Sequence, residues 1–229
     1  RIEESVRRIL AAKYDLGLVE QRLTPIDNID RVVGSKDVWA LANEIAEHAV
    51  TLVRDEDKLV PLKNLKPETK IFNLAVTNGD DRMWIANPFI SRLSRGGVKI
   101  ETAVLDERSS DQEVQKAIER AKSADLVFAS LYGRVRSGQI SSVGIPQSGA
   151  KALSSLIAEK KPMIGISFGN PYLLQNFPGL RAYVVAYGDM PSLQQAVARA
   201  LLGEIDITGK LPISLPGLYP RGTGIQVKK

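Results

Sequence analysis

The sequence contains no cysteine among its 229 residues and one histidine, His48. The missing thiols exclude a disulfide framework, a thiolate metal site and a cysteine nucleophile. A single histidine would need several carboxylates to complete a metal site, and no spacing of such ligands is present. We therefore expect no metal site and no cofactor, and we assign His48 a structural or surface role near the end of a helix.

Long apolar runs and clusters of like charge are also missing. No stretch approaches the ~20 apolar residues that a membrane-spanning helix needs. The net charge is +5, but the 31 basic residues are dispersed among 26 acidic ones, without any nucleic-acid-binding pattern. The sequence therefore predicts no membrane span and no nucleic-acid partner, and it leaves the cellular compartment open.

The first segment has the pattern of an amphipathic helix, ended by Gly17. Its apolar residues recur at helical spacing, namely Ile2, Val6, Ile9, Leu10 and Tyr14. A lone helix of this kind has nothing of its own to pack against. We therefore interpret residues 1–17 as the last element of a preceding domain and residues 18–35, which are rich in turn formers, as an extended linker. Because the chain starts within a helix and without methionine, we expect the native N-terminus and any targeting signal to be missing.

The rest of the chain alternates between strand and helix patterns. We expect strands at Ile71–Val76, Val98–Val104, Leu126–Leu131, Met163–Phe168 and Ala182–Tyr187, and helices at Lys36–Val50, Arg82–Ser94, Asp111–Lys122, Gln147–Glu159 and Ser192–Leu202. Several strands are apolar almost throughout, as strands buried on both faces are. This alternation predicts an α/β domain over residues 36–229 with three layers: a doubly wound, mainly parallel sheet with helices on both faces.

Ligands of such sheets bind at the loops that follow the carboxyl ends of the strands. The first of these loops reads Thr77-Asn-Gly-Asp-Asp81, so the glycine fingerprint of dinucleotide-binding proteins is missing. No Walker motif and no Gly-x-Ser-x-Gly nucleophile elbow is present either. The acidic pairs Asp80-Asp81 and Asp106-Glu107 follow the first two strands, and we interpret them as solvated turn residues or helix caps.

The most unusual loop is Tyr132–Ile145, which carries Arg134 and Arg136 among several glycines and serines. At the ligand-binding edge, these arginines could contact sugar hydroxyls or an anionic group. The alternative is that the loop is only a surface connection. The residues by themselves leave both interpretations open.

Three segments together resemble the C-terminal portion of family 3 glycoside hydrolases. The run from Arg1 to Leu18, ending in Lys-Tyr-Asp-Leu-Gly-Leu, is similar to the final helix of that family's N-terminal barrel. Residues 42–62 are similar to the entry into the second domain, and residues 201–216, with Gly209-Lys-Leu-Pro212, to its closing motif. The order and spacing agree from end to end, so the resemblance covers essentially the whole chain.

The resemblance implies a retaining hydrolase of O-glycosyl bonds whose aspartate nucleophile lies in a (β/α)8 barrel preceding residue 1. In many members the acid/base is a glutamate on a loop of the second domain, but the matching stretch here, 132–147, has no carboxylate. That departure, with the weaker match of Phe168-Gly-Asn-Pro-Tyr172, points to the β-N-acetylglucosaminidase branch, which takes its acid/base from an Asp-His pair on a barrel loop.

The resemblance therefore implies no catalytic residue in this chain, and it makes Arg134 and Arg136 candidate substrate-binding residues. The expected partners are the N-terminal barrel domain of the same polypeptide and a carbohydrate substrate at the interdomain cleft. We expect the fragment alone to be inactive. The alternative hypothesis is an independent α/β module that binds a small molecule or a partner without catalysis.

Overall fold

The computed structural model describes residues 1–62, 65–66, 68–138 and 143–229. The chain divides into two compact units, residues 1–42 and residues 43–229. The first unit begins with helix α1 (Ile2–Asp15), followed by the 3₁₀ turn η1 (Ile26–Asn28) and the short helix α2 (Ile29–Val32). The division between the units falls within helix α3 (Lys36–Ala49).

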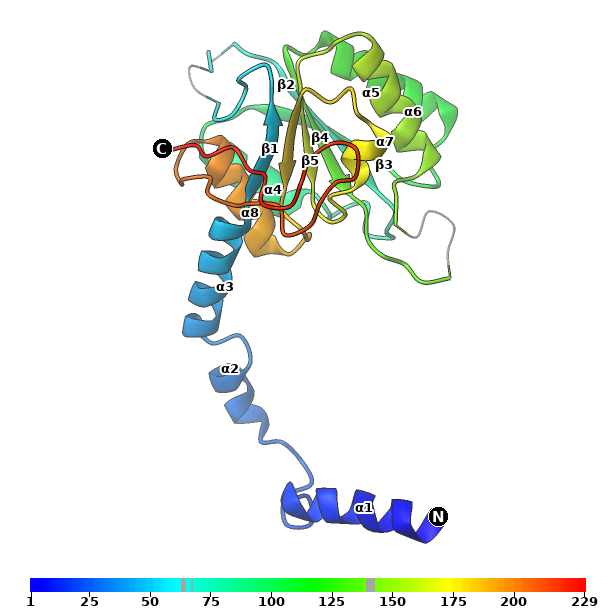
Figure 1. The fold of residues 1–229 in the computed structure, drawn as a ribbon, viewed down its shortest axis with the longest axis vertical. Coiled ribbons are helices and arrows are strands. Elements are labelled where there is room, and N and C mark those ends of the chain that lie inside the picture. The colour runs from blue at the N-terminus through cyan, green and yellow to red at the C-terminus, as the bar shows by residue number, and fades with distance from the viewer. Residues whose placement is uncertain (63–64, 67, 139–142) are drawn as a thin grey trace. The chain divides into compact units, whose positions relative to one another are not determined.

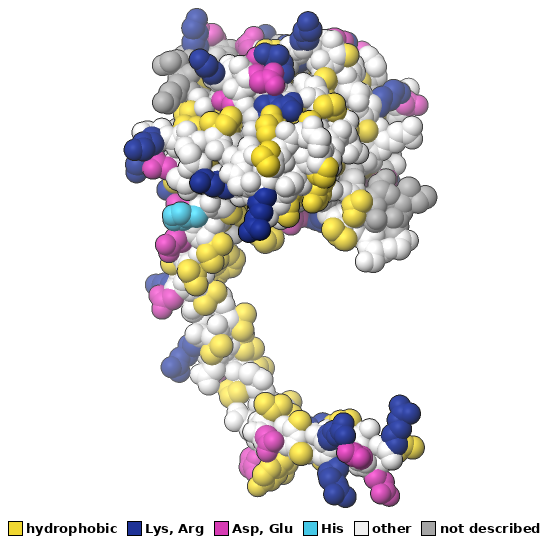
Figure 2. Space-filling model, in the orientation of Figure 1, with side chains coloured by type: hydrophobic (Ala, Val, Ile, Leu, Met, Phe, Trp, Pro, Cys, Tyr) yellow, Lys and Arg dark blue, Asp and Glu magenta, His cyan; other side chains and the backbone are white. Residues whose placement is uncertain are grey.

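The first unit buries no side chain of α1, η1 or α2. The predicted amphipathic helix is confirmed, and Gly17 follows it at a φ of 68°, which glycine adopts without the penalty of a Cβ atom. The segment after Gly17 is not wholly extended, because it contains η1 and α2. Apolar side chains are exposed along these helices, as Figure 2 shows.

A sheet forms the centre of the second unit (Figure 1). It has six strands in the order β1-β6-β5-β4-β2-β3. The strands are β1 (Thr51–Asp55), β2 (Ile71–Thr77), β3 (Ile100–Leu105), β4 (Leu126–Tyr132), β5 (Met163–Ser167) and β6 (Ala182–Val185). Strands β2 to β6 run parallel, and β1 pairs antiparallel with β6 at one edge. The predicted mainly parallel sheet is therefore confirmed.

Helices cover both faces of this sheet. Helices α4 (Asn87–Arg95) and α8 (Pro191–Leu201) pack together on one face, and α5 (Asp111–Ser123) and α6 (Gln147–Ala158) pack together on the other, beside the short helix α7 (Leu173–Asn176) (Figure 1). Each face has its own apolar cluster. On the α4 side, Phe89 makes edge-to-face contacts with Phe128 and Phe168. The three predicted layers are present.

Two local differences from the sequence-based expectation have simple causes. Helix α4 starts at Asn87 rather than at Arg82, because Pro88 lacks a backbone N–H and fits only the first turn of a helix. The stretch after α3 is a full strand, β1, whose burial depends on its pairing with β6 far along the chain. Local sequence does not contain that information.

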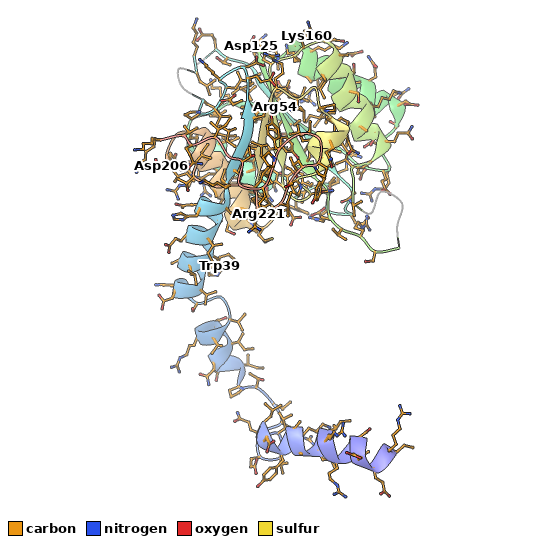
Figure 3. The ribbon with its side chains drawn as sticks, in the orientation of Figure 1. Trp39, Arg54, Asp125, Lys160, Asp206 and Arg221 are labelled. Atoms are coloured by element: carbon orange, nitrogen blue, oxygen red, sulfur yellow. The ribbon has the colours of Figure 1, made fainter. Side chains whose placement is uncertain are left out.

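The last part of the chain returns across β1. Leu52 forms an antiparallel bridge with Ile225, and Leu52 O accepts a hydrogen bond from the backbone N–H of Ile225 at 2.8 Å. Arg54, labelled in Figure 3, donates from Nε to the Tyr219 hydroxyl at 2.8 Å and from Nη1 to the carbonyl of Leu180 at the same distance. The closing segment is therefore part of the folded domain.

Candidate functional site

The topological switch point of the sheet lies between β2 and β4. The chain leaves β2 towards α4 on one face and leaves β4 towards α6 on the other, so the two loops diverge at the carboxyl ends of neighbouring strands. The last paired residues of these strands are Thr77 and Tyr132. Ligands of doubly wound sheets bind in the crevice at such a point.

Asn78 holds the two loops together at this point. Its side chain is 2% exposed, its Nδ2 donates to the carbonyl of Arg134 at 2.8 Å, and its Oδ1 accepts from the backbone N–H of Arg134 at 3.0 Å. The neighbouring backbone N–H of Gly79 donates to Thr77 Oγ1 at 2.9 Å. These bonds fix the backbone at the start of the β4–α6 loop.

The Arg134 guanidinium bridges carboxylates from two other loops. It donates from Nη1 and Nη2 to the two carboxylate oxygens of Asp81, at 3.0 and 2.6 Å, and from Nε to Asp189 Oδ2 at 2.5 Å. Hydrogen bonding to Asp81, followed by hydrogen bonding to Asp189, raises the Arg134 pKa despite partial burial. A single side chain therefore joins the loops after β2, β4 and β6.

Buried groups behind Asp189 keep its loop in place. Gln194 Nε2 donates to the backbone carbonyl of Asp189 at 2.7 Å, and the Tyr132 hydroxyl donates to Gln194 Oε1 at 3.2 Å. Burial raises the pKa of Tyr132 well above its ordinary value, so the phenol stays protonated and remains a donor. The polar network thus extends from the core to the surface arginine.

Gly79 makes room for this arrangement. A Cβ atom at residue 79 would lie 2.3 Å from Nη1 of Arg134 and 2.8 Å from Oδ1 of Asp81. Both distances are shorter than van der Waals contact, so any larger residue would displace the ion pair. The glycine is required here by space and not by its backbone angles.

Arg136 also points back onto the β2 loop. It donates from Nη1 to the backbone carbonyl of Asn78 and from Nη2 to Asp80 Oδ2 at 3.2 Å. Asp80 is 84% exposed, so this partner is largely hydrated. Residues 139–142 of the same loop lie outside the described residues. The structure therefore brings both predicted arginines to the switch-point edge and engages each with carboxylates.

The charged groups around Arg134 and Arg136 are already paired with one another. Three carboxylates, those of Asp80, Asp81 and Asp189, pair with the two guanidinium groups, which leaves a net charge of −1 on these five groups. An anionic ligand would have to compete with carboxylates already in place. The arrangement suits a neutral polar ligand better than an anion.

Asp106, after β3, was misinterpreted from the sequence. It is not a solvated turn residue but 2% exposed, with Oδ2 accepting from Arg108 Nη2 at 2.6 Å and Oδ1 lying 3.4 Å from Nη1 of Arg82. Burial acts to raise its pKa, but the hydrogen bonds from Arg108 outweigh burial, and the pKa is lowered. The nearby Arg108 was the available sequence signal.

A cleft of about 670 Å³ lies beside Asp106, between the starts of α5 and α6. Ser110, Gln147 and Lys151 are among its lining residues. Lys151 is bonded to Asp111 at 2.8 Å, so its charge is already compensated. Neither Arg134 nor Arg136 is among the residues that line this cleft.

Large apolar side chains are exposed in the loops that meet at Arg134. We call this set the edge patch: Met83, Trp84, Val135, Val143 and Met190, each more than half exposed. Met83 and Trp84 follow Asp81, Val135 follows Arg134 and Met190 follows Asp189. Exposed apolar side chains of adjoining loops are the usual material of an interaction surface. The edge patch was not identified from the sequence, because it comes from three separate loops.

His48 is exposed, and its Nδ1 lies 2.9 Å from the carbonyl of Glu44 in its own helix. Figure 2 shows this single histidine at the surface. Within residues 1–62, 65–66, 68–138 and 143–229, no group of three or more His, Asp or Glu side chains is placed to hold a metal ion. In the same part of the chain, no helix has the length and apolar character needed to cross a membrane.

The chain thus forms a doubly wound α/β domain with paired charged groups at the carboxyl edge of its sheet, beside the topological switch point. The family model described as "Glycosyl hydrolase family 3 C-terminal domain" matches residues 11–221. The chain therefore belongs to this family, and the resemblance inferred from three segments of the sequence is confirmed.

Individual relatives agree with this assignment. A β-N-acetylglucosaminidase/β-glucosidase of Cellulomonas fimi is 26% identical over an alignment of 222 residues, which covers 93% of this chain and 38% of the relative. A periplasmic β-glucosidase of Salmonella typhimurium is 24% identical over 260 residues, covering 94% of this chain and 34% of that protein. The chain thus spans less than two fifths of the length of the curated relatives it matches.

Solved structures show the same fold. A family 3 β-N-acetylglucosaminidase from Paenibacillus sp. str. FPU-7 superposes with a TM-score of 0.73 at 21% identity, over 93% of this chain and 39% of that one. A β-glucoside phosphorylase superposes with a TM-score of 0.70 at 26% identity, over 93% and 38% of the two chains.

Proposed function

We propose that this chain is the C-terminal domain of a retaining β-glycosidase that hydrolyses β-N-acetylhexosaminide-type substrates. In this proposal the nucleophile and the acid/base belong to a (β/α)8 barrel of the same polypeptide. Residues 1–17 are the last helix of that barrel, residues 18–35 are the interdomain linker and residues 36–229 are the accessory domain. The accessory domain supports the barrel and lines the rim of the substrate cleft.

The observation that carries this proposal is the composition of the switch-point edge. Arg134, Arg136 and three carboxylates lie where doubly wound domains bind ligands. The exposed residues of the edge patch are close to them in the sequence. Amphipathic surfaces of this kind, with an exposed indole such as Trp84 beside hydrogen-bonding groups, suit the apolar faces and hydroxyls of a sugar.

The substrate class follows from the charges. Because the two guanidinium groups are already engaged by carboxylates, a neutral sugar fits this rim better than a uronic acid or a phosphorylated sugar. The N-acetylhexosaminide preference rests on the Cellulomonas fimi relative, whose name includes that activity, and on the missing carboxylate at 132–147. We assign Arg134 and Arg136 to the substrate rim.

A comparison of the isolated chain with a barrel-containing polypeptide tests the proposal. The isolated chain should fold and should not hydrolyse an aryl β-N-acetylglucosaminide, because it contains no nucleophile and acid/base pair. The polypeptide with its barrel should hydrolyse this substrate with retention of anomeric configuration, as followed by NMR of the first-formed sugar.

Two results would overturn the proposal. Turnover by the isolated chain, at a rate unchanged by repurification, would place catalysis within these residues. A native polypeptide without any barrel would favour the alternative of an independent binding module.

A further inference from the structure

We infer that Arg134 is a positioning residue, which locks the start of the β4–α6 loop, whereas Arg136 is the arginine that faces substrate. The inference deepens the proposed function and rests on it for the identity of the ligand. It assigns different roles to two arginines that are only two residues apart in the sequence. The difference in role is argued from the groups that each guanidinium already binds.

All three nitrogens of the Arg134 guanidinium donate hydrogen bonds within the protein. Its Nε, Nη1 and Nη2 each donate to a carboxylate oxygen, and the two acids, Asp81 and Asp189, come from different loops. Asp81 is 37% exposed and Asp189 is 24% exposed, so neither pair is a fully hydrated surface contact. A bidentate pair plus a third charge-assisted bond fixes a side chain far better than one exposed pair does.

The backbone of Arg134 is locked as well. Asn78 bonds both the N–H and the carbonyl of residue 134, and Gly79 leaves the space that the guanidinium fills. Side chain and main chain are thus held from opposite sides by the β2 loop. Residue 134 is therefore the fixed point from which residues 135–138 extend.

Arg136 is held differently. Its Nη1 donates to the backbone carbonyl of Asn78, and its Nη2 donates to a single carboxylate oxygen, of Asp80, at 3.2 Å. Asp80 is 84% exposed. A ligand hydroxyl can displace so hydrated a partner at little cost. Arg136 follows Val135 of the edge patch, and its place in space depends on the Arg134 anchor.

Amide hydrogen exchange on this chain tests the anchor without requiring any activity. In Arg134→Met, exchange at the backbone amide of residue 134, which donates to Asn78 Oδ1 at 3.0 Å, should accelerate by about 10-fold or more, because the loop opens locally. Asp189→Asn should accelerate exchange at the same amide, although residue 189 lies in the loop after β6. Arg181→Met is the matched control, since Arg181 makes a bidentate pair with Asp57 outside this edge; it should leave exchange at residue 134 unchanged.

Should Arg134→Met fail to fold, Asp189→Asn and Gly79→Ala decide the question by the same exchange measurement. Unchanged exchange at the amide of residue 134 in the folded variants would overturn the anchoring role.

Steady-state kinetics of the barrel-containing polypeptide test whether Arg134 and Arg136 have these two different roles. Arg134→Met and Asp189→Asn should each raise KM for an aryl β-N-acetylglucosaminide several-fold, and the double variant should be no worse than the more affected single variant. Arg134→Lys keeps the positive charge, but an ammonium group cannot make the bidentate pair with Asp81 and the further bond to Asp189. This variant should therefore not restore KM to its value in the unsubstituted protein. Arg136→Met should raise KM without changing exchange at the amide of residue 134.

The opposite pattern would mean direct contact. If Arg134 itself binds substrate, Asp189→Asn should lower KM or leave it unchanged by freeing the guanidinium, and Arg134→Lys should partly restore binding. An inactive polypeptide with intact exchange differences would refute the proposed function while leaving the anchor in place.

Discussion

At the residue scale, the carboxyl edge of the sheet depends on arginines that pair with acids from other loops. Arg134 joins the loops after β2, β4 and β6, and Arg82 joins the β2 loop to Asp106 and Glu113 beyond β3. Isolated surface pairs contribute little to stability, but pairs that involve a buried carboxylate contribute more. Asp106 is the clearest case.

Replacing Asp106 by asparagine should make the stability of the domain less dependent on pH. Because the folded-state pKa is lowered, the carboxylate contributes stability above its ordinary pKa of 3.8 and loses that contribution as the pH falls through the folded-state pKa. At pH 7, Asp106→Asn should lower the free energy of unfolding by about 1–3 kcal/mol. Urea titrations between pH 7 and pH 3 would show this difference shrinking towards zero below the ordinary value.

Glu107→Gln is the control for that series. Glu107 is the adjacent residue and is exposed, so its replacement should change the free energy of unfolding by less than about 0.5 kcal/mol at pH 7. A loss at Asp106→Asn that stays constant down to pH 3 would show that the carboxylate charge is not the stabilising feature.

Gly149, in the first turn of α6, should not tolerate alanine. A Cβ atom there would lie 2.1 Å from Cγ1 of Val76, a stiff β-branched side chain in the centre of the sheet. Alanine normally favours helices over glycine by up to ~1 kcal/mol, but the overlap with Val76 outweighs this gain. Gly149→Ala should therefore destabilise the domain by about 1–3 kcal/mol in chemical denaturation. In the double variant with Val76→Ala, which removes the two obstructing methyl groups, the penalty of alanine at 149 should shrink but not vanish, because the Val76 Cβ remains 3.0 Å away.

At the element scale, helix α5 has a complete capping box. Ser110 Oγ accepts from the Glu113 backbone N–H at 3.3 Å, and Glu113 Oε2 accepts from the Ser110 backbone N–H at 2.9 Å. The sequence pattern Ser-Asp-Gln-Glu predicts this motif, and the structure confirms it. Hydrogen bonding, first from the Ser110 backbone and then from Arg82, lowers the Glu113 pKa.

Ser110→Ala should cost about 1 kcal/mol of stability, because it leaves N-terminal amides of α5 without their acceptor. Thermal and urea denaturation measure this loss. The matched control is Ser94→Ala, an exposed serine in the last turn of α4, which should be neutral or slightly stabilising because alanine is the better helix former. Equal effects at both serines would contradict a specific capping role.

At the scale of the whole molecule, residues 1–34 bury no side chain, whereas residues 43–229 contain both apolar clusters. We predict that a chain starting at Lys36 keeps the stability of the full chain, with free energies of unfolding that agree within about 0.5 kcal/mol. Chemical denaturation followed by tryptophan fluorescence makes the comparison, because the shortened chain still contains both Trp39 and Trp84. A loss of more than about 2 kcal/mol would mean that the first helices stabilise the domain directly.

The sequence by itself determined the fold class. Buried parallel strands are apolar throughout, and amphipathic helices repeat at 3.6 residues, so both kinds of element are encoded locally. Five strands followed from such patterns, and the family followed from the resemblance of three segments to family 3 glycoside hydrolases. The start of α4 was wrong by several residues because one proline outweighed a longer amphipathic pattern.

Only the tertiary structure decided what the edge residues do. Arg134 and Arg136 were identified as candidates from one loop, but their partners lie 53 to 58 residues away along the chain. Asp106 looked like a turn residue because burial cannot be seen from a dipeptide, and the edge patch joins three loops that approach one another only when the sheet forms. Local periodicity fixes elements, whereas ion pairs between loops depend on which strands become neighbours, and that is a property of the assembled sheet.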